Sequence, residues 1–353
     1  MTSAGAEPAV PGPPPRGSPR LWGRIALAVA LGACSALYVV AFAWANPDFV
    51  SDFDQVWGAA RALLAGDNPY DAVGPGRRYP WRWPLYYPLP AVILTTPLAF
   101  VPVVAARAVF AGVSAALLAW AITRDGFARW PLFLSISFVT AIELTQWSPL
   151  LTAAMLMPSL GWLAVTKPNL GAVMAAHAES NRTLFILVGG SLTLLALSFA
   201  VQPGWVADWI EKVRSAPHFK APIGRPFGFV LLLALLRWRR PEARLLAALA
   251  LVPQTPTFYD HVLVFAVART VRESLTLTVC TFAVFFVIGF NAPLPSFDAW
   301  GDLLARATVY LIYLPALVMV LRRPNSGNVP ELLTRFEQLL RSGATRAFAG
   351  FRR

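Results

Sequence analysis

The run LWGRIALAVALGACSALYVVAFAWA, residues 21–45, decides the class of fold. It contains one charged residue, Arg24, and it exceeds the roughly 20 apolar residues with which a helix crosses a bilayer. Ala41-Phe42-Ala43 has the small-x-small pattern of a signal-peptide cleavage site, so a cleaved leader is the alternative. Because the run is longer than the apolar part of a typical signal peptide, we expect an uncleaved first membrane helix behind Arg20 and Arg24.

The rest of the chain has the same character. Of its 353 residues, 57% are hydrophobic and 14% are charged, whereas a soluble domain usually carries about 25% charged residues. We therefore predict an all-α integral membrane protein, a polytopic helical bundle of about 10–12 segments. After the first helix, apolar segments fall near 88–101, 103–123, 130–144, 148–165, 168–178, 183–202, 226–236, 243–256, 261–268, 273–291 and 302–321. Several hold fewer than about 17 residues, so tilted, re-entrant or fused segments are expected among them.

The basic charge of the chain raises the question of nucleic-acid binding. The net charge is +12 and the isoelectric point lies near 10.5. The basic residues stand in short clusters between apolar runs, however, which is typical of loops held in the cytoplasm. The clearest clusters are residues 237–240, RWRR, and the tail after Leu321, with seven Arg and two Glu. We therefore expect membrane lipids as partners and no nucleic acid.

These clusters also predict an orientation. Placing them and the N-terminus in the cytoplasm requires an even number of passes. The loops then expected outside are 46–87, 204–225, 254–261 and 292–301. The second of these conflicts with the rule, because it carries Lys212, Arg214, Lys220 and Arg225. Either these residues meet an anionic ligand outside, or the count of passes is wrong by one.

The pattern divides the chain into three regions. Residues 1–20 are rich in proline and cannot bury a core, so we expect a disordered cytoplasmic tail. Residues 21–321 form the transmembrane domain, with 46–87 as its first extracytoplasmic loop, and 322–353 form a basic cytoplasmic tail. Residues 330–340 of that tail are expected to form an amphipathic helix on an anionic leaflet. Cys34 and Cys280 lie in apolar runs without metal-ligand spacing, and we expect both to be buried free thiols.

The first outer loop opens with a predicted amphipathic helix. Ser51 is a suitable N-cap, Asp54 completes a capping-box pattern, and Gly66 is a suitable stop after the last turn. One helical face is apolar and consists of Phe53, Val56, Trp57, Ala60, Leu63 and Leu64. We expect this helix to lie at the outer membrane surface.

Two carboxylates stand in the first turn of that helix. Both complement the helix dipole, and Asp54 is already employed by the cap. Asp52 is not needed for the cap, so its carboxylate is available to face a cavity. Together they form a D-x-D pair, which can hold a divalent ion, but the pattern is too common to favour a metal. We therefore expect no metal and no other cofactor.

The loop ends in alternating aromatic and basic residues. Residues 81–87 read WRWPLYY, and Arg77 and Arg78 precede them. One interpretation is an interfacial aromatic belt. The other is a binding site in which Trp and Tyr rings face a sugar and an Arg, such as Arg78 or Arg82, meets a phosphate.

Taken together, these motifs resemble a known family. The run from Asp52 through residues 59–66, AARALLAG, to residues 68–71, NPYD, strongly resembles the first outer loop of glycosyltransferase family 87, and so does 87–90, YPLP. The family consists of multi-spanning enzymes of the glycosyltransferase-C superfamily, which use polyprenol-phosphate sugars, typically mannose. Gln146 and Lys167-Pro168 are similar to its mid-chain motifs, and 255–261, TPTFYDH, is similar to its late Ser-Pro…His element. Thr145 departs from the glycine usual there, and the late element has one His.

The resemblance implies a role for individual residues. Asp52 matches the acid that deprotonates the acceptor hydroxyl, while Lys167 and His261 match positions near the donor phosphate. Arg78 and Arg82 are expected to assist at the phosphate, and the expected supporting residues are Asp54, Gln146, Asp260 and Tyr87. The charge-based topology independently places Asp52, Lys167 and Asp260-His261 on the outer face, but it places Gln146 near the inner side.

The resemblance therefore implies a glycosyltransferase of the bacterial plasma membrane. The expected donor is a polyprenyl-phosphate sugar, and the expected acceptor is a lipid or glycan hydroxyl on the extracytoplasmic face. A transporter or lipid flippase would also explain many apolar passes, although no acidic relay stands in mid-helix and no inverted repeat is visible. A non-catalytic assembly subunit is the third class.

Overall fold

The computed structural model describes residues 21–216, 220–255, 258–335 and 337–338. The tail predicted for residues 1–20 lies outside this part of the chain, as do the last residues of the basic tail. Residues 331–335 are helical, at the start of the amphipathic helix predicted in the C-terminal tail.

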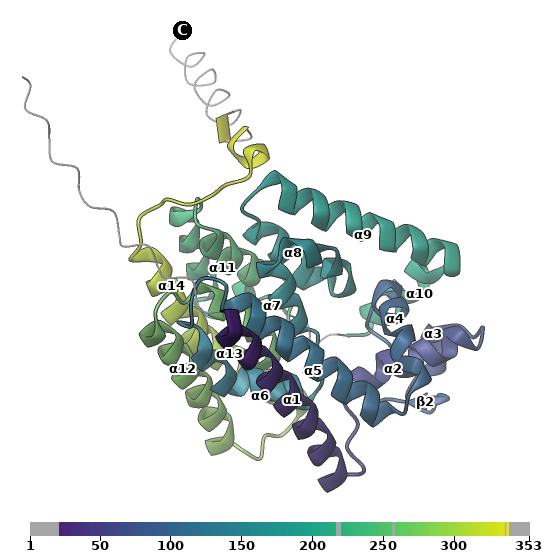
Figure 1. Ribbon diagram of the computed structural model, residues 1–353. Coiled ribbons are helices and arrows are strands. Elements are labelled where there is room, and N and C mark those ends of the chain that lie inside the picture. The colour runs from purple at the N-terminus through teal and green to yellow at the C-terminus, as the bar shows by residue number, and fades with distance from the viewer. Residues whose placement is uncertain (1–20, 217–219, 256–257, 336, 339–353) are drawn as a thin grey trace, which may run out of the picture.

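The described chain is mostly helical (Figure 1). The longer α-helices are α1 (Leu21–Ala45), α2 (Asp52–Leu64), α5 (Val103–Ile122), α9 (Asn181–Val201), α10 (Trp205–Arg214), α11 (Pro241–Leu251), α12 (Val271–Phe290) and α13 (Phe297–Thr308). The shorter ones are α3 (Pro69–Ala72), α4 (Leu89–Thr95), α6 (Ile136–Glu143), α7 (Ser148–Leu156), α8 (Pro168–His177) and α14 (Leu314–Leu321). Between them lie the 3-10 helices η1 (Thr96–Phe100), η2 (Trp130–Leu134), η3 (Pro158–Thr166), η4 (Pro222–Gly224), η5 (Gly228–Arg237) and η6 (Phe258–Val267), and the π-helical turn η7 (Val309–Tyr313).

In the part of the chain that the structure describes, five helical stretches are long and apolar enough to cross a membrane: α1, α5, α9, α12 and the continuous run Phe297–Leu321. This identifies the chain as a membrane protein, as its composition predicts. Each of the other predicted apolar segments is also helical, but in pieces of five to eleven residues. Each of these shorter pieces alone is shorter than the roughly 20 residues with which a helix crosses a bilayer.

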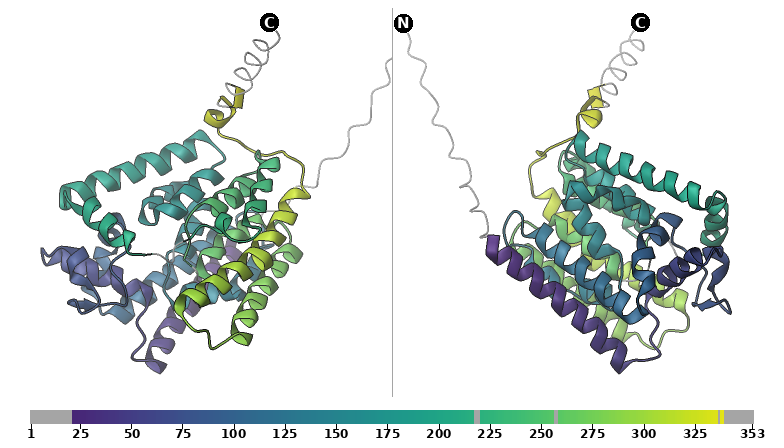
Figure 2. Two further views of the ribbon diagram at one scale, coloured as in Figure 1. Left: turned by 180° about the vertical axis from the view of Figure 1, so that it is seen from behind. Right: turned by 45° about the vertical axis from the view of Figure 1, so that its right-hand side comes forward.

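Close packing of small residues joins α1 to α5, which lie side by side in Figure 1 and in the right-hand view of Figure 2. A Cβ added at Gly32 would lie 3.0 Å from the carbonyl oxygen of Gly112 and 3.0 Å from the Cβ of Ala116. Small residues let membrane helices approach in this way. The opposite face of α1 is exposed, and Cys34 lies on it. The prediction of two buried thiols is therefore wrong, because α1 buries only the side toward α5; Cys280 is half-buried.

Loops predicted to share one face of the molecule do lie together. Asn68 of the first loop donates to Asp208 of α10 at 3.0 Å. The backbone N–H of Gln254 donates to the Lys220 carbonyl at 3.3 Å. The ring of Trp83 lies 5.4 Å from that of Phe297. The described parts of loops 46–87, 204–225, 254–261 and 292–301 thus gather on one side, which we call the site face.

The basic clusters predicted for the cytoplasm meet on a different part of the molecule. Arg237 donates to the carbonyl oxygen of Arg323 at 2.6 Å. Glu242 is buried and accepts at 3.1 Å from Arg240, Arg269 and Arg323. A buried carboxylate needs such partners because water no longer solvates it. The network ties the start of the C-terminal tail to the ends of η5, α11 and α12.

One element departs from an all-α fold. Strands β1 (Val73–Gly74) and β2 (Tyr79–Pro80) form a parallel pair two residues long. Gly76 has a φ of +68° in the turn between them, a conformation that favours glycine. The pair holds Tyr79 against α2, where a Cβ on Gly58 would lie 2.8 Å from the tyrosine ring.

Candidate active site

The helix that presents the candidate base forms as predicted. The Ser51 side chain accepts from the backbone N–H of Phe53 at 3.3 Å, and the Ser51 N–H donates to Asp54 at 3.1 Å, which completes the capping box. Gly66 follows the last turn with a φ of +81°. On the predicted apolar face Phe53, Val56 and Ala60 are fully buried, whereas Leu64 is half exposed. The helix therefore packs most firmly at the end that carries the two carboxylates.

Asp54 is a structural anchor. Its two oxygens accept from the guanidinium of Arg107 on α5, and both side chains of this ion pair are largely buried. Arg107 also donates to the Phe49 carbonyl at 3.3 Å. Both oxygens of Asp54 are therefore engaged by partners within the protein. No cluster of three potential metal ligands occurs within the described ranges.

Asp52 faces a cavity of about 1030 Å³ on the site face. The wall is mainly apolar and aromatic and includes Phe49, Val50, Trp81, Trp83, Tyr86, Tyr87, Leu144, Trp209, Val213, Tyr259 and Phe297. Four charged side chains also line it: Asp48, Asp52, Arg82 and Lys167. Rings with a few convergent charged groups are typical of a small-molecule site.

A chain of hydrogen bonds orients the Asp52 carboxylate. The Gln146 side-chain amide donates to Asp52 Oδ2, and the Gln146 carbonyl oxygen accepts from the Tyr87 hydroxyl at 3.2 Å. Gln146 lies in the tight turn between α6 and α7, next to Thr145, whose φ is +50°. The supporting role expected for Gln146 and Tyr87 thus has a geometric basis.

The expectation that Gln146 lies near the inner side is wrong. The topology counted residues 88–101 as a full crossing, but this segment begins and ends on the site face. At its start the Tyr87 carbonyl accepts from Tyr70 at 3.2 Å, and at its end the Val101 carbonyl accepts from Trp57 at 3.2 Å. Helix α4 and η1 are too short to cross and pack against α2 instead. Without this crossing Gln146 lies on the site face. Lys167 lies there too, so residues 148–165 also begin and end on that face, as the short helices α7 and η3.

Lys167 lines the same cavity and has an internal counter-ion. Its ammonium lies 2.6 Å from the carboxylate of Asp260, which is fully buried on η6. It also lies 4.8 Å from the centre of the Tyr259 ring. The prediction that Lys167 and Asp260 share one face of the molecule with Asp52 is consistent with this geometry. Asp260 lies behind the lysine and does not line the cavity.

The electrostatics suit a base. Burial raises the pKa of Asp52 from 3.8 to about 6, and the charge of Lys167 and the Gln146 hydrogen bond offset part of that rise. A carboxyl with such a pKa is ionised at neutral pH and is more basic than an ordinary aspartate. Burial also raises the pKa of Asp54, against the opposing effect of Arg107.

The expected phosphate-binding residues do not all meet. Arg82 lines the cavity, with its guanidinium 5.3 Å from the Trp83 ring. Arg78 does not line it; this arginine forms an exposed ion pair with Asp67 at 2.6 Å. His261 is buried but lines a second, smaller pocket. The structure thus groups Asp52, Gln146, Tyr87, Lys167 and Arg82.

Sequence reasoning missed one wall of the cavity. Helix α10 contributes Trp209 and Val213, and the Trp209 indole donates to the Tyr86 carbonyl at 2.9 Å. The amphipathic pattern of residues 205–214 was the available signal. Lys212 lies 3.8 Å from Asp71 of the first loop, so part of the unexpected basic charge has a partner on the site face.

Comparison of the chain with protein-family models, with curated proteins and with solved structures finds no match.

Proposed function

We propose that this membrane protein is a glycosyltransferase that moves a sugar, expected to be mannose, from a polyprenyl phosphate to a hydroxyl of a lipid or glycan acceptor. The observation that supports this best is Asp52, a carboxylate of raised pKa that Gln146 holds toward a large, aromatic-lined cavity. An amphiphilic cavity suits a lipid-linked sugar, because rings can cover the sugar faces while charged groups meet the hydroxyls and the phosphate.

In the proposed reaction Asp52 accepts the proton of the acceptor hydroxyl as its oxygen attacks the anomeric carbon. The bond from that carbon to the phosphate oxygen breaks, and the polyprenyl phosphate leaves with the bonding electrons. Lys167 and Arg82 stabilise the charge that develops on the departing phosphate. A single displacement of this kind inverts the anomeric configuration.

The membrane placement is part of the same proposal. The site face lies outside, both termini lie in the cytoplasm, and the membrane is a bacterial plasma membrane. The shorter helices then bring the number of apolar segments to about 10–12, several of them broken or re-entrant. Non-helical backbone at membrane depth is tolerated where it is buried in protein or lines a cavity. The turn after α6 meets this condition, because Gln146 is buried and Leu144 lines the cavity.

The decisive test compares Asp52→Asn with the wild type in a transfer assay on purified protein. Labelled polyprenyl-phosphate mannose is incubated with lipid and glycan acceptors. Loss of a general base typically costs about 10²–10⁴ in rate, so we expect transfer to fall at least about a hundredfold. Asp67→Asn is the matched control, because Asp67 is exposed on the same loop and lies outside the cavity.

Equal transfer by the wild type and Asp52→Asn would refute the role of Asp52. Absence of transfer in both proteins with every donor tried, together with movement of lipid phosphates between leaflets, would favour the flippase alternative.

A further inference from the structure

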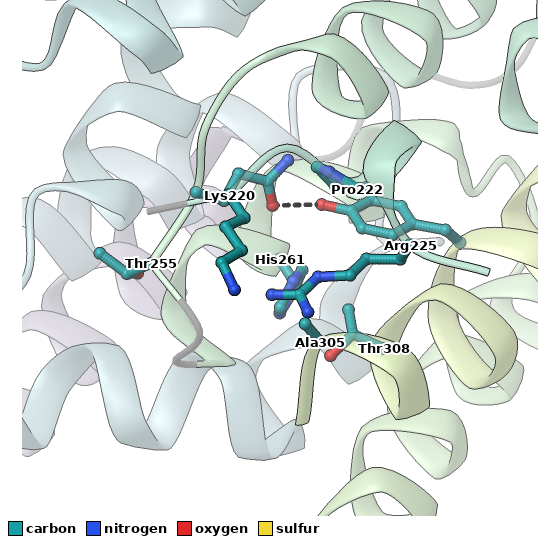
Figure 3. A pocket seen from close by; sticks show the side chains of 9 residues that line it. Lys220, Pro222, Arg225, Thr255, His261, Ala305 and Thr308 are labelled. Atoms are coloured by element: carbon teal, nitrogen blue, oxygen red, sulfur yellow. Dashed lines mark hydrogen bonds between the residues drawn. The ribbon is translucent and has the colours of Figure 1, made fainter. Parts of the chain in front are cut away.

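A second pocket on the site face adjoins the large cavity, with which it shares Thr255 (Figure 3). Lys220, Arg225 and His261 line it, and their side chains point toward one another in the figure. They come from three separate parts of the chain: the segment after α10, the residue after η4, and η6. None of these three side chains lines the cavity that Asp52 faces.

The pocket has buried donors that lack acceptors. The Arg225 Nε is buried and has no partner among the described residues, and neither has the hydroxyl of Thr308, a residue that is 2% exposed. Both residues line the pocket. Leaving buried donors unsatisfied costs about 1–3 kcal/mol each, so this arrangement points to an acceptor that fills the site.

The charges around the pocket leave it positive. Asp302 is the carboxylate that meets both cations: it pairs with Arg225 and lies 3.8 Å from Lys220. One carboxylate thus faces two permanent cations. Lys220 is held in place through Gln254, whose N–H donates to the Lys220 carbonyl and whose side chain accepts from the Tyr313 hydroxyl at 2.6 Å.

We propose that this pocket binds a phosphate-class oxyanion. A planar guanidinium, an ammonium and a hydroxyl offer donors from several directions, which suits a tetrahedral group with three free oxygens. The pocket volume of about 20 Å³ has room for only one or two water-sized groups. Only the phosphoryl oxygens enter, and the remainder of the ligand extends toward the shared wall at Thr255.

Two sources can supply this oxyanion, a lipid-linked phosphate or a free inorganic phosphate. The lipid-linked source rests on the proposed function, whereas the oxyanion site itself does not. Basic residues usually favour cytoplasmic loops, yet Lys220 and Arg225 stand in a loop that we expect outside. Binding an anion there would explain their position.

The test is calorimetric titration of the purified full-length protein in detergent with inorganic phosphate and with farnesyl phosphate. Farnesol is the control for the tail. We expect Arg225→Gln to weaken binding at least about tenfold, since a hydrogen bond to a charged group contributes about that much. Thr308→Val removes a hydroxyl that has no partner among the described residues, so it tests the same pocket in a variant expected to fold. We expect a loss of about threefold to tenfold there.

Arg214→Gln is the matched control, because it removes the same charge from an exposed residue near the pocket's segment but outside its wall. Competition between the two probes, with farnesyl phosphate binding more tightly, supports the lipid-linked source. Binding of inorganic phosphate alone supports the free source. Absence of binding by either probe, or equal binding by the wild type, Arg225→Gln and Thr308→Val, would overturn the proposal.

Failure of this proposal is distinguishable from failure of the proposed function. Asp52→Asn is expected to lose transfer and to keep oxyanion binding, because Asp52 does not line this pocket. Unchanged transfer in that variant would refute the catalytic role while leaving the binding result intact.

Discussion

Asp52 and Asp54 stand two positions apart on one helix, yet their environments give them different roles. Asp54 turns toward α5, where Arg107 and the backbone N–H of Ser51 occupy its oxygens. Asp52 turns toward the cavity, where Gln146 is its hydrogen-bond donor. Burial without a full counter-charge raises the pKa of Asp52 to about 6, and this shift has consequences for activity and for stability.

The acid limb of the pH–rate profile is expected to follow Asp52. Transfer should decline as the pH falls through about 6, because a protonated carboxyl cannot act as base. Gln146→Ala removes a hydrogen bond that lowers the pKa, so the limb should move to higher pH. Tyr87→Phe, which releases the other side of the Gln146 amide, should move it less in the same direction. Profiles of kcat/KM against pH measure both effects.

Gln55→Ala is the control for that experiment, since Gln55 lines the same cavity but is not among the groups that shift the Asp52 pKa. An acid limb that stays in place in Gln146→Ala would show that the amide does not tune the base.

Asp52 is also expected to cost stability. Its pKa is higher in the folded chain than its ordinary value of 3.8, so ionisation favours the unfolded state. The cost is absent below about pH 4, grows as the pH rises through about 6, and is complete above that, at no more than about 3 kcal/mol. Asp52→Asn should therefore raise the unfolding midpoint at pH 7.5 and leave it unchanged near pH 4. A midpoint that is equally raised at both values would contradict the titration.

At the scale of elements, the buried ion pair between Asp54 and Arg107 docks α2 onto α5. Removing one partner of a buried pair leaves an uncompensated charge, which typically costs about 3–5 kcal/mol. Arg107→Gln should therefore destabilise the protein strongly. The double variant Asp54→Asn with Arg107→Gln should regain most of that loss, because neither side chain is then charged. Unfolding midpoints in detergent for the full double-mutant cycle measure the coupling.

If the stability losses of the two single variants simply add in the double variant, Asp54 and Arg107 do not couple the two helices.

The docking of α2 onto α5 also holds Asp52 in a fixed position. The N-terminal turn of α2 is held by its own cap, by Arg107 and by a hydrogen bond of 2.8 Å from the Ser51 hydroxyl to the Leu144 carbonyl.

At the scale of the whole molecule, the site face and the basic network of Glu242 occupy different parts of the molecule. If the site face lies outside, single cysteines should report it. In a variant lacking Cys34 and Cys280, Arg77→Cys, at an exposed position of the first loop, should react with a membrane-impermeant thiol reagent in intact cells. Asn325→Cys, beside Arg239, should react only after permeabilisation. The reverse pattern would contradict the proposed orientation.

The sequence alone determined the class of protein and the local structure of its first loop. Long apolar runs predict membrane helices because a backbone in lipid must bond to itself. The cap at Ser51, the stop at Gly66 and the helix between them follow from side-chain bonds within a few residues, and the structure confirms them. The gathering of the four outer loops was also predicted, from the alternation of apolar segments and loops. The charge of each loop did not predict it, because 204–225 is basic.

Only the tertiary structure decided which distant side chains meet. Gln146 reaches Asp52 because residues 88–101 return to the face they left, and a short apolar run does not itself say whether it crosses or returns. Arg78 and Arg82 are equivalent in sequence, yet Arg78 has an exposed partner and Arg82 faces the cavity. The pocket of Lys220, Arg225 and His261 draws on three separate segments. Contacts between segments depend on packing in space, and spacing along the chain does not encode them.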